Sequence, residues 1–166
     1  MNKKGFTLTE VIVVVIIVGV LASIALPMYA RSVERARATE AMSAVKAMND
    51  AIYAFFAERE VCPTQFRQLV VNMPVSNLNS SSIQTQHFQF DMGSNVQTRA
   101  VPGTTCPGVL ATRIHGGRYS YKIWNPYTRS TTDNGFSLQC APVTTGDKTN
   151  IAVCESLGLY RAATEE

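Results

Sequence analysis

The chain has 166 residues, of which 46% are hydrophobic and only 16% are charged, and its formal net charge is +3. The length fits one domain of ordinary size, and the low content of charged residues excludes a chain that is disordered by composition. The low net charge, with no Lys/Arg run beyond Lys3-Lys4, argues against a nucleic-acid-binding protein. His87 and His115 are the only histidines, too few for a histidine-built metal site. Because the apolar residues are concentrated near the N-terminus, the composition suggests an anchored extracytoplasmic domain.

Val11 to Ala30 is a run of twenty residues without a charged side chain. As a helix it is about 30 Å long, which matches the hydrocarbon core of a bilayer. Lys3 and Lys4 precede the run, so the positive-inside bias places the N-terminus in the cytoplasm and the rest of the chain outside. A cleaved secretory signal has a shorter apolar stretch. A plain membrane anchor does not explain Glu10, because a carboxylate at the edge of the hydrocarbon core is energetically unfavourable without a partner.

The residues around Glu10 form a recognisable pattern, Lys3-Lys4-Gly5-Phe6-Thr7-Leu8-Thr9-Glu10, followed by the apolar run. This pattern resembles the class III signal of type IV pilins and pilin-like proteins, and only Thr9 departs from its commonest form. Gly19 and Pro27 match residues that recur in the anchor helix of that family. The resemblance implies the α+β type IV pilin fold, in which a long N-terminal α-helix packs against a four- or five-stranded antiparallel β-sheet.

The resemblance also implies roles for individual residues. A prepilin peptidase is expected to cut between Gly5 and Phe6, after which the Phe6 amine is N-methylated. Phe6, Glu10, Gly19 and Pro27 are expected to act in assembly, with Glu10 of one subunit neutralising the Phe6 amine of a neighbour and so setting register. Because Pro27 removes a backbone donor, residues 19 to 27 are expected to be the weakest part of the helix. This stretch is expected either to kink in the membrane and unwind in a filament or to carry only a static proline kink.

Beyond Met28 the apolar residues recur every three or four positions, which predicts an amphipathic helix. The predicted seam consists of Ala38, Ala41, Val45, Met48, Ile52 and Phe55. Charged residues, Glu34 among them, are expected on the other faces. We therefore expect one helix from Phe6 to about Arg59, roughly 80 Å long, that ends before Pro63. A helix of that length cannot be buried in one small domain, so one half must contact lipid or other copies of the chain.

Short alternating runs in the remainder of the chain are typical of β-strands. The expected strands are residues 87–91, 109–114, 118–124, 135–140 and 150–154. His115-Gly116-Gly117-Arg118 is expected to form the turn between two paired strands, and residues 65–71 a short helix capped by Thr64. We expect these strands to form one antiparallel sheet packed across the helix seam.

Four cysteines in an exported segment predict two disulfides. The sequence leaves all three pairings open, and it contains no close Cys-x-x-Cys pair of the kind that zinc sites use. The resemblance favours Cys140–Cys154, which closes a compact C-terminal loop as in many pilins, and this choice leaves Cys62–Cys106.

The sequence shows no motif for catalysis or cofactor binding. Gly-x-Ser-x-Gly, His-Glu-x-x-His and phosphate-loop patterns are all absent, so we expect no enzymatic activity, no cofactor and no metal. Arg113, Arg118 and Arg129 could belong to an adhesive or DNA-binding surface, but a solvated sheet face is the simpler interpretation. No specific nucleic acid is therefore predicted as a partner.

The resemblance divides the chain into a cleaved leader (1–5), a transmembrane or filament-core half-helix (6–30), an amphipathic half-helix (31–60) and a disulfide-linked β-sheet head (61–166). It implies a structural subunit of a type IV pilus that polymerises into a homo-oligomeric helical filament. The expected partners are prepilin peptidase, the inner-membrane assembly platform and membrane lipid. The expected location is the bacterial inner membrane before assembly and the extracellular filament afterwards. The alternatives are a minor pilin or type II secretion pseudopilin, and a membrane-anchored periplasmic binding protein.

Overall fold

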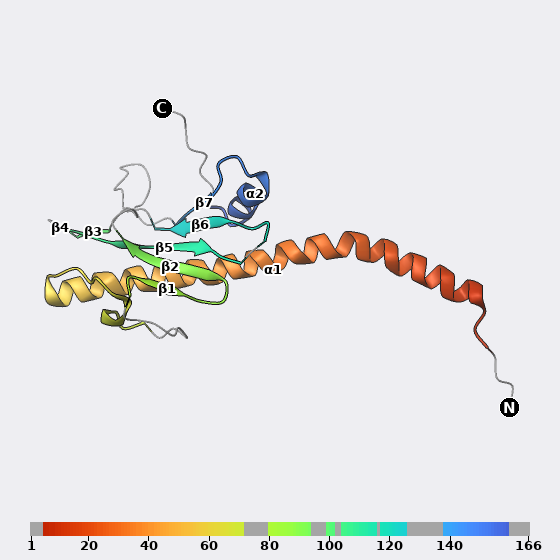
Figure 1. Ribbon diagram of the computed structural model, residues 1–166, viewed down its shortest axis with the longest axis horizontal. Coiled ribbons are helices and arrows are strands. Elements are labelled where there is room, and N and C mark those ends of the chain that lie inside the picture. Colours follow the sequence, from red (N-terminus) through yellow and green to blue (C-terminus); the bar gives the residue numbers. More distant parts are fainter. Residues whose placement is uncertain are drawn as a thin grey trace.

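The computed structural model describes residues 5–71, 80–93, 99–101, 104–115, 117–125 and 138–159. A single long helix, α1 (Leu8–Arg59), runs the length of the molecule. No other described element packs against its N-terminal half, which we call the bare half-helix. Its C-terminal half packs against a head of β-strands and a second helix (Figure 1). The architecture is the expected α+β class, a long helix against a five-stranded antiparallel sheet.

Both ends of α1 are capped. The side chain of Thr7 accepts a hydrogen bond from the backbone N–H of Glu10, and the Glu10 carboxylate accepts one from the backbone N–H of Thr7, which together form a capping box. The helix therefore starts at Leu8, two residues after the start that the sequence predicts. At the other end, Glu60 has a positive φ of 57° and ends the helix after Arg59.

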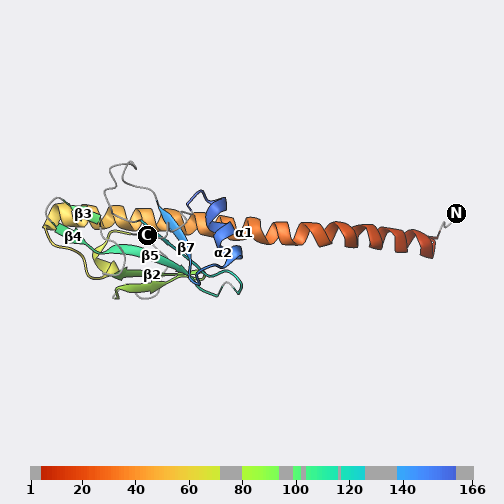
Figure 2. The same cartoon turned by 90° about the horizontal axis from the view of Figure 1, so that it is seen from above.

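One stripe of α1 packs against the sheet, which lies along its C-terminal half (Figure 2). The buried residues of α1 are Glu34, Ala38, Ala41, Val45, Met48, Asn49 and Ile52. Five of the six predicted seam residues are thus buried, and the sixth, Phe55, is half-buried. The polar Glu34 and Asn49 are the members of this stripe that the seam prediction omits.

The main sheet contains five antiparallel strands in the order β1-β2-β5-β6-β7. Their bounds are β1 Ser82–Gln84, β2 Phe88–Gly93, β5 Gly108–Arg113, β6 Tyr121–Trp124 and β7 Gln139–Pro142. In the central register Phe90 pairs with Ala111, Ala111 with Ile123, and Ile123 with Cys140. All four side chains are buried, so a continuous row of apolar side chains crosses the sheet on its core face.

Four of the predicted strands correspond to β2, β5, β6 and β7, with shifted ends. Residues 135–137 of the last of these, and Gly116 of the predicted turn, lie outside the described residues. β5 and β6 are indeed antiparallel neighbours, and the chain between them has positive φ at His115 (53°) and Gly117 (60°). Such values are typical of tight reversals.

The predicted strand at residues 150–154 is wrong, because these residues belong to helix α2 (Lys148–Ser156). The Asp147 carboxylate accepts hydrogen bonds from two backbone N–H groups of the first turn, at 2.9 and 3.4 Å, and so caps the helix. Asn150, Val153 and Cys154 form the buried face at helical spacing. The alternation of Ile151 and Val153 that imitates a strand is a coincidence within this helix.

Four short elements differ from the prediction or are absent from it. β3 (Arg99–Val101) and β4 (Thr104–Cys106) form a separate two-stranded sheet. These strands, and β1, have three residues each, too few to show an alternating pattern. Where a helix over 65–71 is predicted, the chain makes only the 3₁₀ turn η1 (Phe66–Gln68). There the Gln68 side chain accepts hydrogen bonds from the backbone N–H groups of Thr64 and Gln65.

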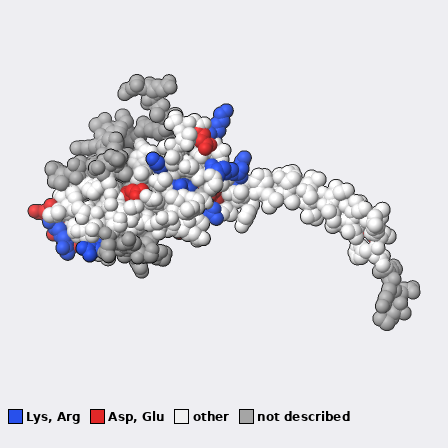
Figure 3. Space-filling model, viewed as in Figure 1, with Lys and Arg blue, Asp and Glu red and all other residues white. Residues whose placement is uncertain are grey.

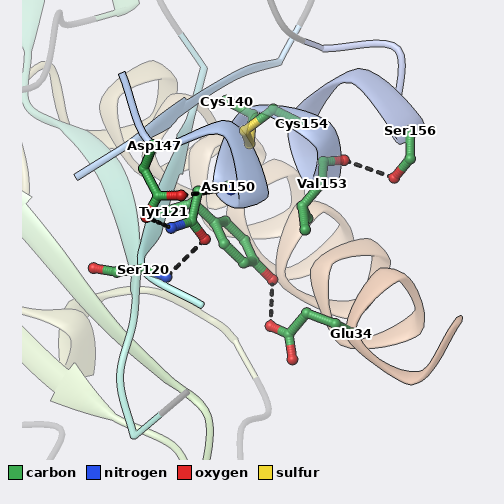
Figure 4. The surroundings of a disulfide bond; sticks show 9 residues. All are labelled: Glu34, Ser120, Tyr121, Cys140, Asp147, Asn150, Val153, Cys154 and Ser156. Atoms are coloured by element: carbon green, nitrogen blue, oxygen red, sulfur yellow. Dashed lines mark hydrogen bonds between the residues drawn. A yellow bond between two sulfur atoms is a disulfide. The ribbon is translucent and has the colours of Figure 1, made fainter. Parts of the chain in front are cut away.

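Two disulfides join the elements of the head. Cys62, just after α1, is bonded to Cys106 at the end of β4, and Cys140 of β7 is bonded to Cys154 of α2. The second bond and its surroundings are shown in Figure 4. These are the two pairs that the resemblance favours, and they connect the far end of α1 and the helix α2 to the rest of the head.

Candidate functional site

The predicted processing residues lie at the exposed start of the described chain. Gly5 and Phe6 precede α1, and the Phe6 side chain is 86% exposed. No atom beyond the immediate neighbours lies within 4 Å of the position that a Gly5 side chain would occupy. Exposed, non-helical backbone of this kind is what proteases cleave most readily. The Gly5–Phe6 bond is therefore sterically accessible to a peptidase.

Glu10, the predicted assembly residue, is already hydrogen-bonded within its own chain. Its carboxylate accepts from the Thr7 backbone N–H at 2.9 Å and from the Thr7 hydroxyl at 2.6 Å. A negative charge in the first helical turn is also favoured by the helix dipole. Thr7 was not among the predicted site residues, although Thr followed three positions later by Glu is the sequence signature of a capping box. The capping box holds the carboxylate close to the chain segment that contains Phe6.

The N-terminal half of α1 has no partner within the described molecule. Its large apolar side chains between Val11 and Leu26 are 48–66% exposed. By length and composition α1 can cross a membrane, and none of its most apolar window is buried inside the molecule. Twenty uncharged residues are incompatible with a water-exposed surface of this size in a stable monomer. This half of the helix must contact lipid or protein.

Gly19 and Pro27 lie within this exposed half, and α1 is an uninterrupted helix through both. Figure 1 shows that this half curves gently. The Ser23 hydroxyl donates to the Val20 carbonyl at 2.7 Å, while Pro27 has no backbone N–H to donate to the Ser23 carbonyl. The predicted unwinding of this stretch in a filament stays a prediction.

A buried ionic cluster joins α1 to the sheet where the head begins. The Arg113 guanidinium donates to both oxygens of the Glu34 carboxylate, with Nε–Oε1 at 2.6 Å and Nη2–Oε2 at 3.1 Å. The Tyr121 hydroxyl donates to the same carboxylate at 2.9 Å, as Figure 4 shows. Arg37, partly exposed, adds a third contact at 3.3 Å. The Glu34 and Arg113 side chains are only 1% and 2% exposed, so this pair is almost fully removed from water.

The cluster shifts the ionisation of both acids. Burial raises the pKa of the Glu34 carboxyl, but the hydrogen bonds from Arg113 and Tyr121 and the charge of Arg113 lower it by more, so the pKa of Glu34 lies below its ordinary value. Burial, together with the negative charge of Glu34, raises the pKa of Tyr121. The cluster therefore holds an ionised carboxylate and a neutral phenol inside the head.

The sequence does not predict this cluster. The expected positions of Glu34 on an outer face of α1 and of Arg113 on a solvated or binding surface are wrong, because both side chains are buried. A signal for Glu34 is present, since it lies four residues before Ala38 and so continues the three-and-four spacing of the seam. Arg113 lies in β5 two residues after the buried Ala111, on the same face. A charged residue at a core position of each element indicates an ion pair.

Two buried asparagines complete the polar contacts of the head. Asn49 of α1 accepts from the Val109 N–H of β5 at 3.2 Å and donates to the Val45 carbonyl at 2.9 Å. Asn150 of α2 accepts from the Ser120 N–H at 2.8 Å and donates to the Arg118 carbonyl at 3.4 Å. Among the described residues, every buried side-chain nitrogen or oxygen has a hydrogen-bond partner. These contacts fix α1 to β5 and α2 to the segment just before β6.

Comparisons with known proteins agree with the N-terminal pattern. Residues 1–26 match the family model of the prokaryotic N-terminal methylation motif. A fimbrial protein of Neisseria meningitidis is 36% identical over 122 residues, which cover 74% of this chain and 65% of that protein. The type IV major pilin protein PilA of Myxococcus xanthus is 40% identical over 59 residues, 36% of this chain and 27% of that protein. The fimbrial protein EcpC of Eikenella corrodens is 38% identical over 61 residues, covering 37% and 40%.

The methylation motif and these relatives support a type IV pilin family for this chain. The methylation motif, the bare apolar half-helix and the helix-on-sheet head are all features that the resemblance predicts. The alignments with EcpC and PilA cover only 27% to 40% of those proteins. The alignment with the fimbrial protein of Neisseria meningitidis is longer, at 122 residues, and therefore extends beyond α1. The named relatives are pilins and fimbrial proteins.

Proposed function

We propose that this chain is a structural subunit of a type IV pilus, which is inserted in the inner membrane, processed and then polymerised into a helical filament. The observation that carries the proposal is the bare apolar half of α1 directly behind the exposed Gly5–Phe6 bond. Such a half-helix can be buried either in lipid or against the same half-helix of other copies. A subunit that moves from a membrane into a filament needs both.

In this proposal the four predicted parts have separate tasks. Residues 1–5 are the leader that prepilin peptidase removes on the cytoplasmic side. Residues 6–30 anchor the subunit in lipid and later form the filament core. Residues 31–60 hold the head, residues 61–166, outside the membrane and then on the filament surface. The inner-membrane assembly platform extracts the subunit. The absence of catalytic motifs from the sequence supports a structural role.

The proposed assembly contact joins Glu10 of one subunit to the methylated Phe6 amine of its neighbour. Both groups are costly in an apolar core when alone, so their pairing selects one axial register between helices. The Thr7 contacts already orient the Glu10 carboxylate toward the helix start. Replacement of Glu10 by Val is expected to reduce incorporation into filaments, whereas Thr7→Val, which removes only the hydroxyl, is expected to reduce it less. Normal incorporation of the Glu10→Val variant contradicts this role.

The test of the whole proposal is the intact mass of filaments sheared from the native cell surface, measured with and without reductant. The expected dominant species starts at N-methylated Phe6 and gains four hydrogen atoms on reduction of its two disulfides. A processed chain that is scarce in the sheared fraction indicates a minor pilin or a secretion pseudopilin instead. A chain that stays in the membrane with residues 1–5 attached overturns the proposal and favours an anchored binding protein.

A further inference from the structure

A groove with a strongly basic lining lies between α1 and α2, at the end of the head nearest the bare half-helix. It has a volume of about 520 Å³ and is lined by residues of α1, of α2 and of the chain just before β6. Four of its ten lining residues are cationic, namely Arg31, Arg35, Arg118 and Lys148. Lys and Arg together make up only 15 of the 166 residues in the chain. We call this feature the basic groove.

None of the cations of the basic groove is held in an ion pair between described residues. The lining contains no Asp or Glu among the described residues. The nearest acid on α1 is Glu34, and it is committed to Arg113, Tyr121 and Arg37. The Asp147 carboxylate, next to Lys148, accepts hydrogen bonds from the first turn of α2. The groove lining therefore carries a net positive charge. Figure 3 shows several Lys and Arg side chains, with acidic side chains beside them, where the head meets the bare helix.

The walls of the groove are held in place by buried contacts. Asn150, fully buried in α2, is hydrogen-bonded to the backbone of Ser120 and Arg118. The disulfide between Cys140 and Cys154 ties the same helix to β7. Tyr119 and Val153, both nearly buried, form an apolar floor. The basic groove is thus a preformed cavity with an apolar floor and a cationic rim.

The position of the groove along α1 indicates that it lies at the membrane surface when the apolar half of the helix is inserted in lipid. Arg31 directly follows the twenty-residue uncharged run, and Arg35 lies about 8 Å further along the axis from Ala30. If the run fills the hydrocarbon core of a bilayer, these two residues lie within the headgroup layer, which is about 5–8 Å thick on each side. Arg118 and Lys148 line the same groove from the segment before β6 and from α2.

We propose that the basic groove binds the phosphate of an anionic phospholipid headgroup while the subunit waits in the membrane. The inference rests on the proposed function, because it requires residues 6–30 to be inserted in lipid. Arg and Lys donate charge-assisted hydrogen bonds to phosphate oxygens, and the apolar floor accommodates the glycerol and the start of an acyl chain. The bound headgroup fixes the height and rotation of the head above the membrane before the subunit is extracted.

The test is lipid binding by the full processed chain in neutral detergent micelles, measured by native mass spectrometry or thermophoresis. The probes are dioctanoyl phosphatidylglycerol, dioctanoyl phosphatidylcholine and inorganic phosphate. We expect phosphatidylglycerol to bind much more tightly than the other two, with an affinity that falls as NaCl is raised from about 0.05 M to about 0.5 M. Equal binding of the zwitterionic lipid, or of inorganic phosphate, overturns the proposal.

Two matched double variants locate the binding. Each cation near an anionic lipid surface strengthens binding by about fivefold, so Arg35→Gln/Lys148→Gln is expected to weaken phosphatidylglycerol binding about 25-fold. The control Lys46→Gln/Arg59→Gln removes the same two charge types from exposed positions further along α1, and is expected to change binding less than twofold. All four side chains are exposed, so neither variant should impair folding. Equal effects of the two variants contradict a specific groove.

The result can be separated from the pilus proposal. Lipid binding is measured on the purified chain, and incorporation into sheared filaments is measured on cells, so either can fail while the other succeeds. If Arg35→Gln/Lys148→Gln binds phosphatidylglycerol normally but no longer enters filaments, the basic groove contacts a second copy of the chain, and the lipid proposal is wrong.

Discussion

Replacement of Arg113 by Met is the sharpest test of how the head is fixed to α1. The change keeps the apolar stem but removes the guanidinium, so Glu34 keeps only the Tyr121 hydroxyl and the partly exposed Arg37. Loss of one partner of a buried ion pair costs about 3–5 kcal/mol. Because two of the partners of Glu34 remain, we expect the lower end, a decrease of about 3 kcal/mol in the free energy of unfolding.

The assay is urea unfolding of the full-length chain in neutral detergent, followed by near-UV circular dichroism, which reports aromatic packing in the head. Arg118→Met serves as the matched control, because Arg118 is exposed and lies over the Tyr119 ring. It should change stability by no more than about 0.5 kcal/mol. A second variant, Glu34→Gln/Arg113→Met, leaves a neutral side chain that still accepts from Tyr121, and should recover most of the loss.

The pH dependence of the stability lost in Arg113→Met is an independent test of the ion pair. Without Arg113 the buried Glu34 carboxylate lacks its main counter-charge, so its pKa rises and it can become neutral at mildly acidic pH. The cost of Arg113→Met should therefore be largest near neutral pH and smaller at about pH 4.5. A cost below about 1 kcal/mol at neutral pH, or a double variant no more stable than the single one, refutes the assigned role of the ion pair.

Three further predictions concern the same head. The free energy of unfolding of the wild-type chain should decrease as pH falls below the ordinary carboxyl range. Folding lowers the pKa of Glu34, so the stability that the ionised carboxylate contributes is lost as Glu34 becomes protonated. A free energy of unfolding that stays constant down to about pH 3 contradicts this prediction. Cys140→Ala/Cys154→Ala, which opens a loop with a sequence separation of 14, should lower the free energy of unfolding by about 3 kcal/mol, measured by urea unfolding under oxidising conditions. Asn49→Leu leaves the Val109 N–H without its acceptor and should cost about 1–3 kcal/mol, and an unchanged midpoint argues that this hydrogen bond is replaced by water.

The long helix and its buried seam were predictable because their signals are long. The uncharged run from Val11 to Ala30 and the seam from Ala38 to Ile52 each span several helical turns, so chance agreement with the pattern is small. The end at Arg59 was predictable from the position of Pro63. The predicted helix start, Phe6, lies two residues before the observed start, Leu8. Thr7 and Glu10 form a capping box at this end, whereas the sequence prediction treats them only as part of a processing motif.

The head was less predictable because its signals are short and its decisive contacts are distant in sequence. Residues 150–154 carry apolar residues at both strand and helix spacing, and the Asp147 cap decides between the two. The ion pair of Glu34 and Arg113 joins residues 79 apart in sequence. Taken alone, each is a charged residue of the kind that usually lies on a solvated surface. Only the coincidence of two charged residues at core positions, one in α1 and one in β5, distinguishes this pair from surface charges.

The arrangement of α1 under the head has a mechanical consequence. A pull along the helix axis loads the seam and the buried ion pair together, since they are spread over about 27 Å of the helix from Glu34 to Ile52. Contacts loaded in this way must slide past one another collectively and cannot be peeled apart one at a time. Beyond them, the covalent bond between Cys62 and Cys106 ties the far end of the helix to the head. Under tension along the helix axis, the head is therefore held on α1 by contacts that have to break together, and the disulfide between Cys62 and Cys106 holds the far end of the helix to the head.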